Sequence, residues 1–516
     1  MNRIALVLIA IAFGVACAAE PYDLLVRGGR IADGTGNPAY FADVAVRGGR
    51  IVAIGKLTGA AKETLDATGL VVAPGFIDVH THAENVVQLP RAENFVRMGV
   101  TSLVTGNCGG SRLDVGAFLQ QVEGKVSVNV ATLIGHNTVR SDAMGGSFDR
   151  APTDEELEKM KQLVERAMRD GAVGLSTGLI YLPGTFSQTE EIIELAKVAA
   201  AHDGIYASHM RNEGRNILDA LSELFRIARE GGLRADVSHL KLSGRDAWGR
   251  ADEVLAAIEQ ARADGLDVTH DQYAYTASST SLGTLIPSSA REGGAAKFRE
   301  RIDNPVEKAK IVAAMKAGRP DGYAYAMIAS YPPDKSLNGK TVPEAAKLKR
   351  GSDSLDDQIE WVLEMERNGG GQGVFHSMNE DDLQKFLRHP HTMIASDSGV
   401  REINETLPHP RGYGNNARVL ARYVRELKLL RLEDAIRKMT SLPATSYRLR
   451  DRGVVREGAW ADLIVFDPNT VQEVATFKDP HHYATGFAHV FVNGIEVVRE
   501  DEHTGALAGR ALRLER

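Results

Sequence analysis

Short apolar segments alternate with longer amphipathic ones through the middle of the chain. Eight apolar segments predict buried strands, at residues 76–80, 102–105, 131–134, 173–176, 205–208, 235–238, 266–269 and 393–396. Between several of them, apolar residues recur at helical spacing, as in 154–169 and 190–201. This alternation is typical of parallel βα units. Eight such units fit an α/β fold with a (β/α)8 TIM barrel, whose catalytic groups lie at the carboxyl ends of the strands.

The two ends of the chain share a different pattern. Strand-like segments separated by Gly-rich turns occur at 23–31 and 43–55, and again at 461–467 and 490–494. We expect both ends to build one small β-sandwich domain. The polar stretch 287–359 separates the seventh and eighth strands, and we expect this insertion to cover the barrel mouth.

The predicted domain order follows from these patterns. It is a signal peptide at 1–19, small β domain at 20–73, barrel at 74–286, insertion at 287–359, rest of barrel at 360–452 and small β domain at 453–516.

The first residues indicate export. Asn2 and Arg3 precede an apolar run at 4–15 and small residues at 16–18, the pattern of a cleaved secretory signal. The run is too short for a permanent membrane span, so we expect no transmembrane segment in the mature chain. The expected location is periplasmic or secreted. A lipid-anchored form through Cys17 and a buried N-terminal helix stay open as alternatives.

Composition excludes some classes of function. The 516 residues carry a formal net charge of -7 without a basic cluster, which argues against a nucleic-acid partner. Once a signal is removed, Cys108 is the one cysteine left, so the mature chain has no internal disulfide. Burial and metal ligation are both open for that thiol. The pattern does not predict an oligomeric state.

Potential metal ligands follow the predicted strands. His80 and His82 are two residues apart, so on a strand they face the same side. Cys108 follows the next strand, and His209, His239 and Asp397 end three others. Each alone could be structural, for example a buried histidine or a helix-capping aspartate. Together they can hold one or two zinc ions with a position left open for water.

These residues resemble a known family. Segments 78–82 and 453–467 are similar to the amidohydrolase superfamily. Within it, the chain looks most like the N-acyl-D-amino-acid deacylases, the D-aminoacylase family. The segments that carry this resemblance are 106–109, 176–181, 208–211, 273–280, 409–414 and 438–444.

The resemblance implies a zinc-dependent hydrolysis of N-acyl-D-amino acids to a carboxylate and a free D-amino acid. It assigns a tightly bound zinc to Cys108, His209 and His239, and a second, weaker position to His80, His82 and Asp397. Asp397 would be the general base and then the proton donor, and Tyr181 would polarise the scissile carbonyl. The substrate carboxylate would be bound by Lys241, Tyr273, Ser279 and Arg411.

Several questions stay open in the sequence. Asn416 stands where the family pattern leads us to expect an aromatic residue, which could alter the substrate pocket. A substrate with an acidic side chain would need an extra cation in the pocket, for which Arg291 or another arginine of the insertion is a candidate. A dihydropyrimidinase-like hydrolase of cyclic amides would need a lysine near 172–178, and there is none. The sequence is also compatible with a hydrolase of D-amino-acid dipeptides and with a catalytically silent binding protein.

Overall fold

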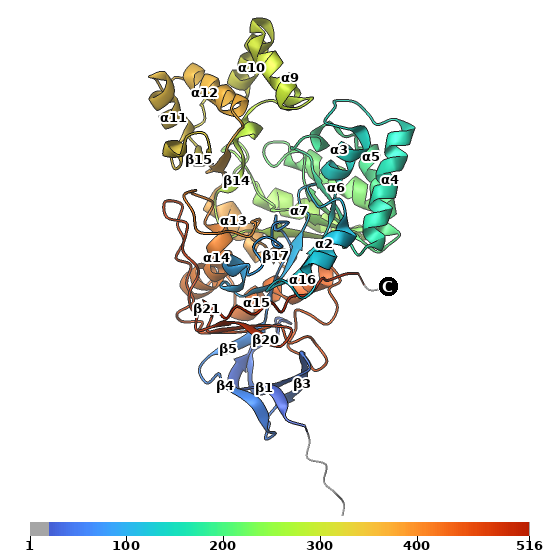
Figure 1. Cartoon of the computed structure of the whole chain (residues 1–516), viewed down its shortest axis with the longest axis vertical. Helices are drawn as coiled ribbons and strands as arrows, with labels where there is room; N and C mark the ends of the chain where they lie inside the picture. Colours follow the sequence, from blue (N-terminus) through green and yellow to red (C-terminus); the bar gives the residue numbers. More distant parts are fainter. Residues whose placement is uncertain (1–19, 515–516) are drawn as a thin grey trace, which may run out of the picture.

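Three parts follow one another along the long axis of the molecule in the computed structural model (Figure 1). A β domain lies at one end, a barrel in the middle and a helical insertion at the other end. The structure describes residues 20–514, so the predicted signal peptide lies outside the described residues. Within 20–514, no helix is both long and apolar enough to cross a membrane.

The middle part is the expected TIM barrel. Its parallel strands are β6 (Phe76–Asp78), β7 (Val100–Thr105), β8 (Asn129–Thr132) continued by β9 (Ile134–Gly135), β10 (Gly174–Gly178), β11 (Ile205–His209), β12 (Arg234–Val237), β13 (Val268–Gln272) and β17 (Thr392–Ile394). The first and last strands close the barrel, since Thr81 bridges Ser398 in parallel and the Asp397 amide donates to the His80 carbonyl at 2.9 Å. The seventh strand runs three residues further than the sequence pattern indicates.

Helices cover the outside of the barrel. They are α1 (Glu93–Val96), α2 (Val115–Val122), α3 (His136–Met144), α4 (Asp154–Arg169), α5 (Thr189–Ala200), α6 (Ile217–Gly231), α7 (Ala251–Ala263), α13 (Glu380–Arg388), α14 (Arg411–Arg418), α15 (Leu432–Met439) and α16 (Ser441–Ser446), with a π-helix at Val419–Glu426. Helix α4 has the predicted bounds because Thr153 and Glu156 form a capping box at its start. Its buried face includes Met160 and Val164, which pack on the barrel.

Both ends of the chain meet in one nine-stranded sheet. The N-terminal strands are β1 (Tyr22–Ile31), β2 (Tyr40–Arg47), β3 (Arg50–Gly55), β4 (Ala61–Asp66) and β5 (Val71–Pro74), and the C-terminal strands are β18 (Leu463–Phe466), β19 (His489–Val492), β20 (Ile495–Arg499) and β21 (Glu502–His503). Strand β18 pairs antiparallel with β5, which joins the two ends. The sheet lies at the far end from the insertion (Figure 1).

The insertion has its own sheet and its own core. Three antiparallel strands, β14 (Ser278–Ser281), β15 (Ala326–Ser330) and β16 (Gln372–Phe375), form the sheet. Five α-helices, α8 (Ser288–Arg291), α9 (Ala295–Asp303), α10 (Pro305–Gly318), α11 (Val342–Arg350) and α12 (Leu355–Arg367), and two short 3-10 helices, at Leu282–Leu285 and Lys335–Leu337, surround this sheet. A separate apolar cluster that includes Trp361 fills the insertion. The insertion therefore extends from Ser278 to Phe375, beyond both ends of the predicted range 287–359.

Candidate active site

The residues singled out from the sequence gather at the carboxyl ends of the barrel strands. His209 is the last residue of β11, and Cys108, His239 and Asp397 follow β7, β12 and β17 within a few residues. The last three have positive φ angles of 52°, 37° and 50°. Side chains other than glycine rarely adopt this left-handed backbone, and such residues cluster at functional sites. The chain therefore turns sharply where these side chains enter the mouth.

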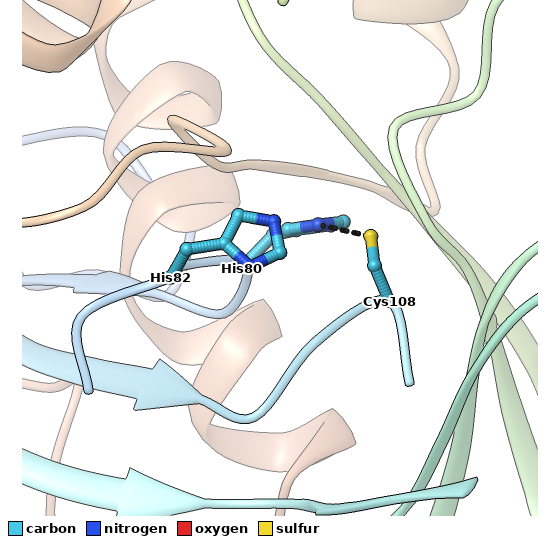
Figure 2. A group of neighbouring side chains, drawn as sticks. All are labelled: His80, His82 and Cys108. Carbon is cyan, nitrogen blue, oxygen red and sulfur yellow. Dashed lines mark hydrogen bonds between the residues drawn. The ribbon is translucent and has the colours of Figure 1, made fainter. Parts of the chain in front are cut away.

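Cys108 lies at the centre of a cluster of nitrogen donors. Its Sγ is 3.3 Å from His80 Nε2, 3.6 Å from His239 Nε2 and 3.7 Å from His209 Nδ1. Figure 2 shows the sulfur directed at the His80 ring, with His82 beside it. Cys108 belongs both to a donor group with His209 and His239 and to one with His80 and His82. The thiol thus stands between two sets of possible metal ligands.

Asp397 joins the cluster from the last strand. Its Oδ1 is 3.2 Å from His82 Nε2 and 3.6 Å from His80 Nε2. With His80 and His239 it forms a third group of donor atoms close enough to share a metal ion. All six predicted ligands therefore converge. The grouping differs from the expectation in two respects, because Cys108 also groups with His80 and His82, and His239 also groups with His80 and Asp397.

The chemistry of these donors fits a divalent metal such as zinc. One thiol, four imidazoles and a carboxylate are ligands that zinc favours. Burial lowers the pKa of His209 and His239 well below the ordinary value, so both rings are neutral at neutral pH and available as donors. The ring nitrogens that face the Cys108 sulfur are His209 Nδ1 and His239 Nε2. Burial raises the pKa of the Cys108 thiol, a cost that a nearby cation would offset.

Asp397 is held in its charged form. Burial alone would raise its pKa, but Arg411, His80 and His82 hold that pKa well below the ordinary value. Arg411 Nη2 is 2.9 Å from Asp397 Oδ2, and both side chains are almost fully buried. The other terminal nitrogen of Arg411, Nη1, is buried without a hydrogen-bond partner. Asp397 can therefore accept a proton, and Arg411 has donor capacity to spare.

Glu213 is a site residue that the sequence analysis missed. Its carboxylate lies 2.6 Å from Lys241 Nζ, 3.0 Å from His239 Nδ1 and 3.5 Å from His209 Nε2. It therefore links two predicted metal ligands to a predicted substrate-binding cation. Its position four residues after His209, in the loop that follows β11, could have indicated that it lies at the barrel mouth.

Asp271 is a second residue that was missed. It is fully buried, and its Oδ2 lies 3.0 Å from His80 Nδ1 while its Oδ1 accepts the His239 amide at 2.9 Å. A carboxylate that accepts a hydrogen bond from Nδ1 fixes the tautomer of an imidazole and leaves the lone pair of Nε2 available to a metal ion. In this structure Nε2 is the His80 atom that faces Cys108 and Asp397.

Three of the predicted substrate-binding residues, Lys241, Tyr273 and Arg411, lie together, and Arg411 pairs with Asp397. The Tyr273 ring has Arg411 Cζ 4.5 Å and Lys241 Nζ 6.0 Å from its centroid. The Ser279 hydroxyl donates to the Gly373 carbonyl at 2.9 Å, and its own carbonyl accepts from Arg411 at 3.4 Å. Ser279 therefore contacts Arg411 through its backbone, and its hydroxyl is already engaged within the insertion.

Tyr181 completes the predicted set. Its ring stands edge to face against His209, with centroids 4.9 Å apart. Burial, and secondarily Cys108, raises the pKa of its hydroxyl well above the ordinary value, so the phenol keeps its proton. Thr280 of β14 donates to this oxygen at 3.1 Å. The Tyr181 proton thus stays free for another acceptor.

A cavity of about 550 Å³ opens above these groups. Tyr181, His209, His239, Lys241 and Asp397 line it from the barrel, and the insertion supplies the opposite wall. The expectation that the insertion covers the mouth agrees with this arrangement.

Two residues that could have altered the pocket do not line it. Asn416 is buried on α14, where its amide contacts Met439 Sδ at 3.3 Å. Arg291 pairs instead with Glu366, at 3.8 Å.

Comparison with known proteins agrees with the resemblance seen in the sequence. The amidohydrolase family model matches residues 63–498. D-aminoacylase of Alcaligenes xylosoxydans xylosoxydans is 39% identical over 519 residues, 96% of this chain and 98% of that one. A crystal structure of D-aminoacylase is similar with a TM-score of 0.82 at 36% identity, covering 96% of this chain and 100% of that one.

A second solved structure is N-acyl-D-glutamate deacylase from Bordetella bronchiseptica, complexed with zinc and a phosphonate inhibitor. It is similar with a TM-score of 0.83 at 35% identity, again over 96% of this chain and 100% of that one. Family model, sequence and structure point the same way: the chain belongs to the amidohydrolase family, on its D-aminoacylase branch.

Proposed function

We propose that this chain hydrolyses the amide bond of N-acyl-D-amino acids with the help of zinc, releasing a carboxylate and a free D-amino acid. The observation that carries the proposal is a cluster of metal donors beside Arg411, a buried cation that has one unpartnered terminal nitrogen. Arg411 Nη1 is buried and unpartnered, and Arg411 and Lys241 both lie at the Tyr273 ring beside Asp397. A buried donor without a partner costs about 1–3 kcal/mol, which an anionic ligand would recover.

The carboxylate of the substrate is the anion that these cations suit. Lys241 and Arg411 donate charge-assisted hydrogen bonds to it, and the Tyr273 ring lies against both cations. This places the adjacent amide towards the donor cluster. Cys108, His209 and His239, which form one close group of donor atoms, would hold the tighter zinc. His80, His82 and Asp397 would hold the weaker one, and Asp397 Oδ1 lies 3.6 Å and 3.2 Å from the Nε2 atoms of the two histidines. Bound zinc supplies Lewis acidity, which makes hydroxide available near neutral pH.

Two side chains then transfer the protons and stabilise the negative charge that develops. Asp397 takes the proton of the attacking water and passes it to the amide nitrogen as the C–N bond breaks, which yields the free amine. Tyr181, which keeps its proton, donates to the carbonyl oxygen as negative charge develops there. Glu213 and Asp271 orient Lys241, His239 and His80 throughout.

The relatives support the choice of substrate. The Alcaligenes protein is named D-aminoacylase, and the phosphonate in the Bordetella protein is a mimic of the tetrahedral intermediate of its reaction. The preference for the D enantiomer rests on these relatives. We also propose export through residues 1–19, which N-terminal sequencing of the secreted product would test.

Matched N-acetyl-D- and N-acetyl-L-amino acids test the proposal. Zinc-loaded mature protein should release free amino acid from the D series, at least about 100-fold faster than from the L series. Chelation should abolish this activity and added zinc should restore it. No turnover of either series with zinc bound would reject the proposal, and D-amino-acid dipeptides and cyclic amides would then be tested. A silent homologue would show neither turnover nor retained metal.

A further inference from the structure

A second cavity, of about 580 Å³, opens beside the amino end of the last barrel strand. Pro390 lines it and stands two residues before β17 begins. The metal donors follow the carboxyl ends of the strands, so this cavity lies at the opposite end of the barrel. Among the described residues 20–514, none lines both this cavity and the active-site cavity. The two are therefore separate sites.

The lining of this second cavity is strongly basic. Its cations are Arg388, Lys428, Arg431, Arg437 and Lys438. Asp434 is the one acid of the lining within the described chain, and the other five lining residues are proline, valine and leucine. Arg431 already holds Asp434, at 2.8 Å. Five cations against one carboxylate leave the lining with a formal charge of +4, in a chain whose net charge is -7.

Three of the cations meet at the segment between α13 and β17. Arg388 is the last residue of α13, and Arg437 Nη1 donates to the Pro390 carbonyl at 3.0 Å. Lys438 Nζ donates to the His389 carbonyl. Helix α15 thus brings two positive charges to the residues that directly follow Arg388. Cations this close repel one another unless an anion lies among them.

The cations of the lining lack carboxylate partners. Apart from Arg431, none of them forms an ion pair within residues 20–514. Lys438 is only 3% exposed, and burial, followed by the nearby charge of Arg437, lowers its pKa to about 7. A buried ammonium without a counter-charge is costly, and an anion in the cavity would offset that cost.

We propose that this cavity binds a phosphate group, taken either from free phosphate or from a lipid headgroup. A phosphate dianion offers several acceptor oxygens, which suit the planar donors of Arg388 and Arg437 and the ammonium group of Lys438. A carboxylate brings a single charge and neutralises less of the lining. The apolar lining residues lower the local dielectric constant and so strengthen the attraction. The site uses none of the residues assigned to hydrolysis, so it stands whether or not the proposed function does.

Isothermal titration of the zinc-loaded chain with inorganic phosphate tests the proposal. Arg388→Gln combined with Lys428→Asn removes two exposed cations, and asparagine tolerates the positive φ of 50° at residue 428. The wild type should bind phosphate, and this double variant should raise the Kd at least about tenfold while keeping the wild-type activity. No binding by the wild type would overturn the proposal.

A matched variant shows whether the binding belongs to this cavity. Lys385 lies on α13 one turn before Arg388, and it does not line the cavity. Lys385→Gln should change the Kd for phosphate less than about twofold. Phosphate held by the active-site zinc would instead compete with substrate and keep its affinity in the double variant. An unchanged Kd in the double variant would therefore overturn the assignment.

The buried lysine provides an independent readout. Phosphate should raise the melting temperature of the wild type and of Lys385→Gln, because it binds the folded state, and should not raise that of Lys438→Met. An equal rise in Lys438→Met would overturn the role of Lys438. If Lys438→Met does not fold, the double variant at the exposed positions 388 and 428 decides.

Flotation with vesicles distinguishes the two sources of the phosphate group. Vesicles of phosphatidylcholine are compared with vesicles that also contain phosphatidic acid, which carries a phosphate monoester. Binding to the second kind alone, displaced by inorganic phosphate and lost in the double variant, assigns the site to a lipid headgroup. Phosphate binding in solution without flotation assigns it to free phosphate. Neither kind of binding would reject the site.

Discussion

At the barrel mouth the charged side chains and histidines contact one another, whereas the insertion lines the same cavity with a mixture of small polar, aliphatic and aromatic side chains. His80 is fixed by Asp271, His239 by Glu213, and Asp397 by Arg411. The insertion instead packs around its own apolar core, away from these contacts. The donor groups therefore lie on the barrel, whereas the insertion contributes only to the wall of the cavity. The wall can change while the donors stay in place.

The largest expected effect comes from removing the proposed base at the barrel mouth. Asp397→Asn keeps the shape of the side chain but loses its charge and its basicity. We expect kcat to fall roughly 10²–10⁴-fold on every substrate, the usual contribution of a general base. Steady-state kinetics together with zinc analysis would check this. A fall of less than about tenfold in zinc-replete protein would exclude Asp397 as the base.

A smaller effect is expected one contact away from the donors. Asp271→Asn weakens the hold on His80 Nδ1, and losing such a carboxylate typically costs about 10–100-fold in metal affinity or activity. Competition with a chelator would measure the zinc affinity. Asp267→Asn is the matched control, since this carboxylate is exposed near the start of β13. Unchanged zinc affinity in the Asp271 variant would show that the barrel donors do not need this support.

The smallest effect on the donors should come from damage inside the insertion. Trp361 is 2% exposed in the core of the insertion, so Trp361→Ala should destabilise that unit by about 3–5 kcal/mol. We expect faster proteolytic cleavage within 278–375 and unchanged zinc content. Val306→Ala, at an exposed position on α10, should change neither. Loss of zinc from the Trp361 variant would show that the two parts are not independent.

The barrel and the convergence of its six predicted metal ligands could be read from the sequence because both follow from strand ends. Asp271 was missed because the seventh strand was predicted to end at residue 269, while it continues to Gln272. Residues two apart on a strand face the same side, so a strand that continued past residue 269 would have placed Asp271 on the same face as Thr269. Glu213 lies in a loop, where periodicity gives no direction.

The insertion was harder to interpret. Strand β14 reads Ser-Ser-Thr-Ser, without the apolar alternation that marks a strand, and it forms through pairing with β16, far along the chain. The direction of Arg291 likewise depends on its tertiary partner Glu366. The side chains that the insertion presents to the cavity therefore could not be predicted from the sequence.

The most direct test of the division between barrel and insertion compares kcat/KM for a large and a small substrate in two variants. Tyr181→Phe removes a donor at the barrel mouth and should lower both values by a similar factor, on the order of 10²-fold, leaving their ratio unchanged. Ala314→Trp, at a position on α10 that lines the active-site cavity, should change the ratio about tenfold with little effect on the small substrate. If Tyr181→Phe shifts the ratio as strongly as Ala314→Trp does, or if Ala314→Trp lowers both values equally, the two regions do not divide chemistry from selection.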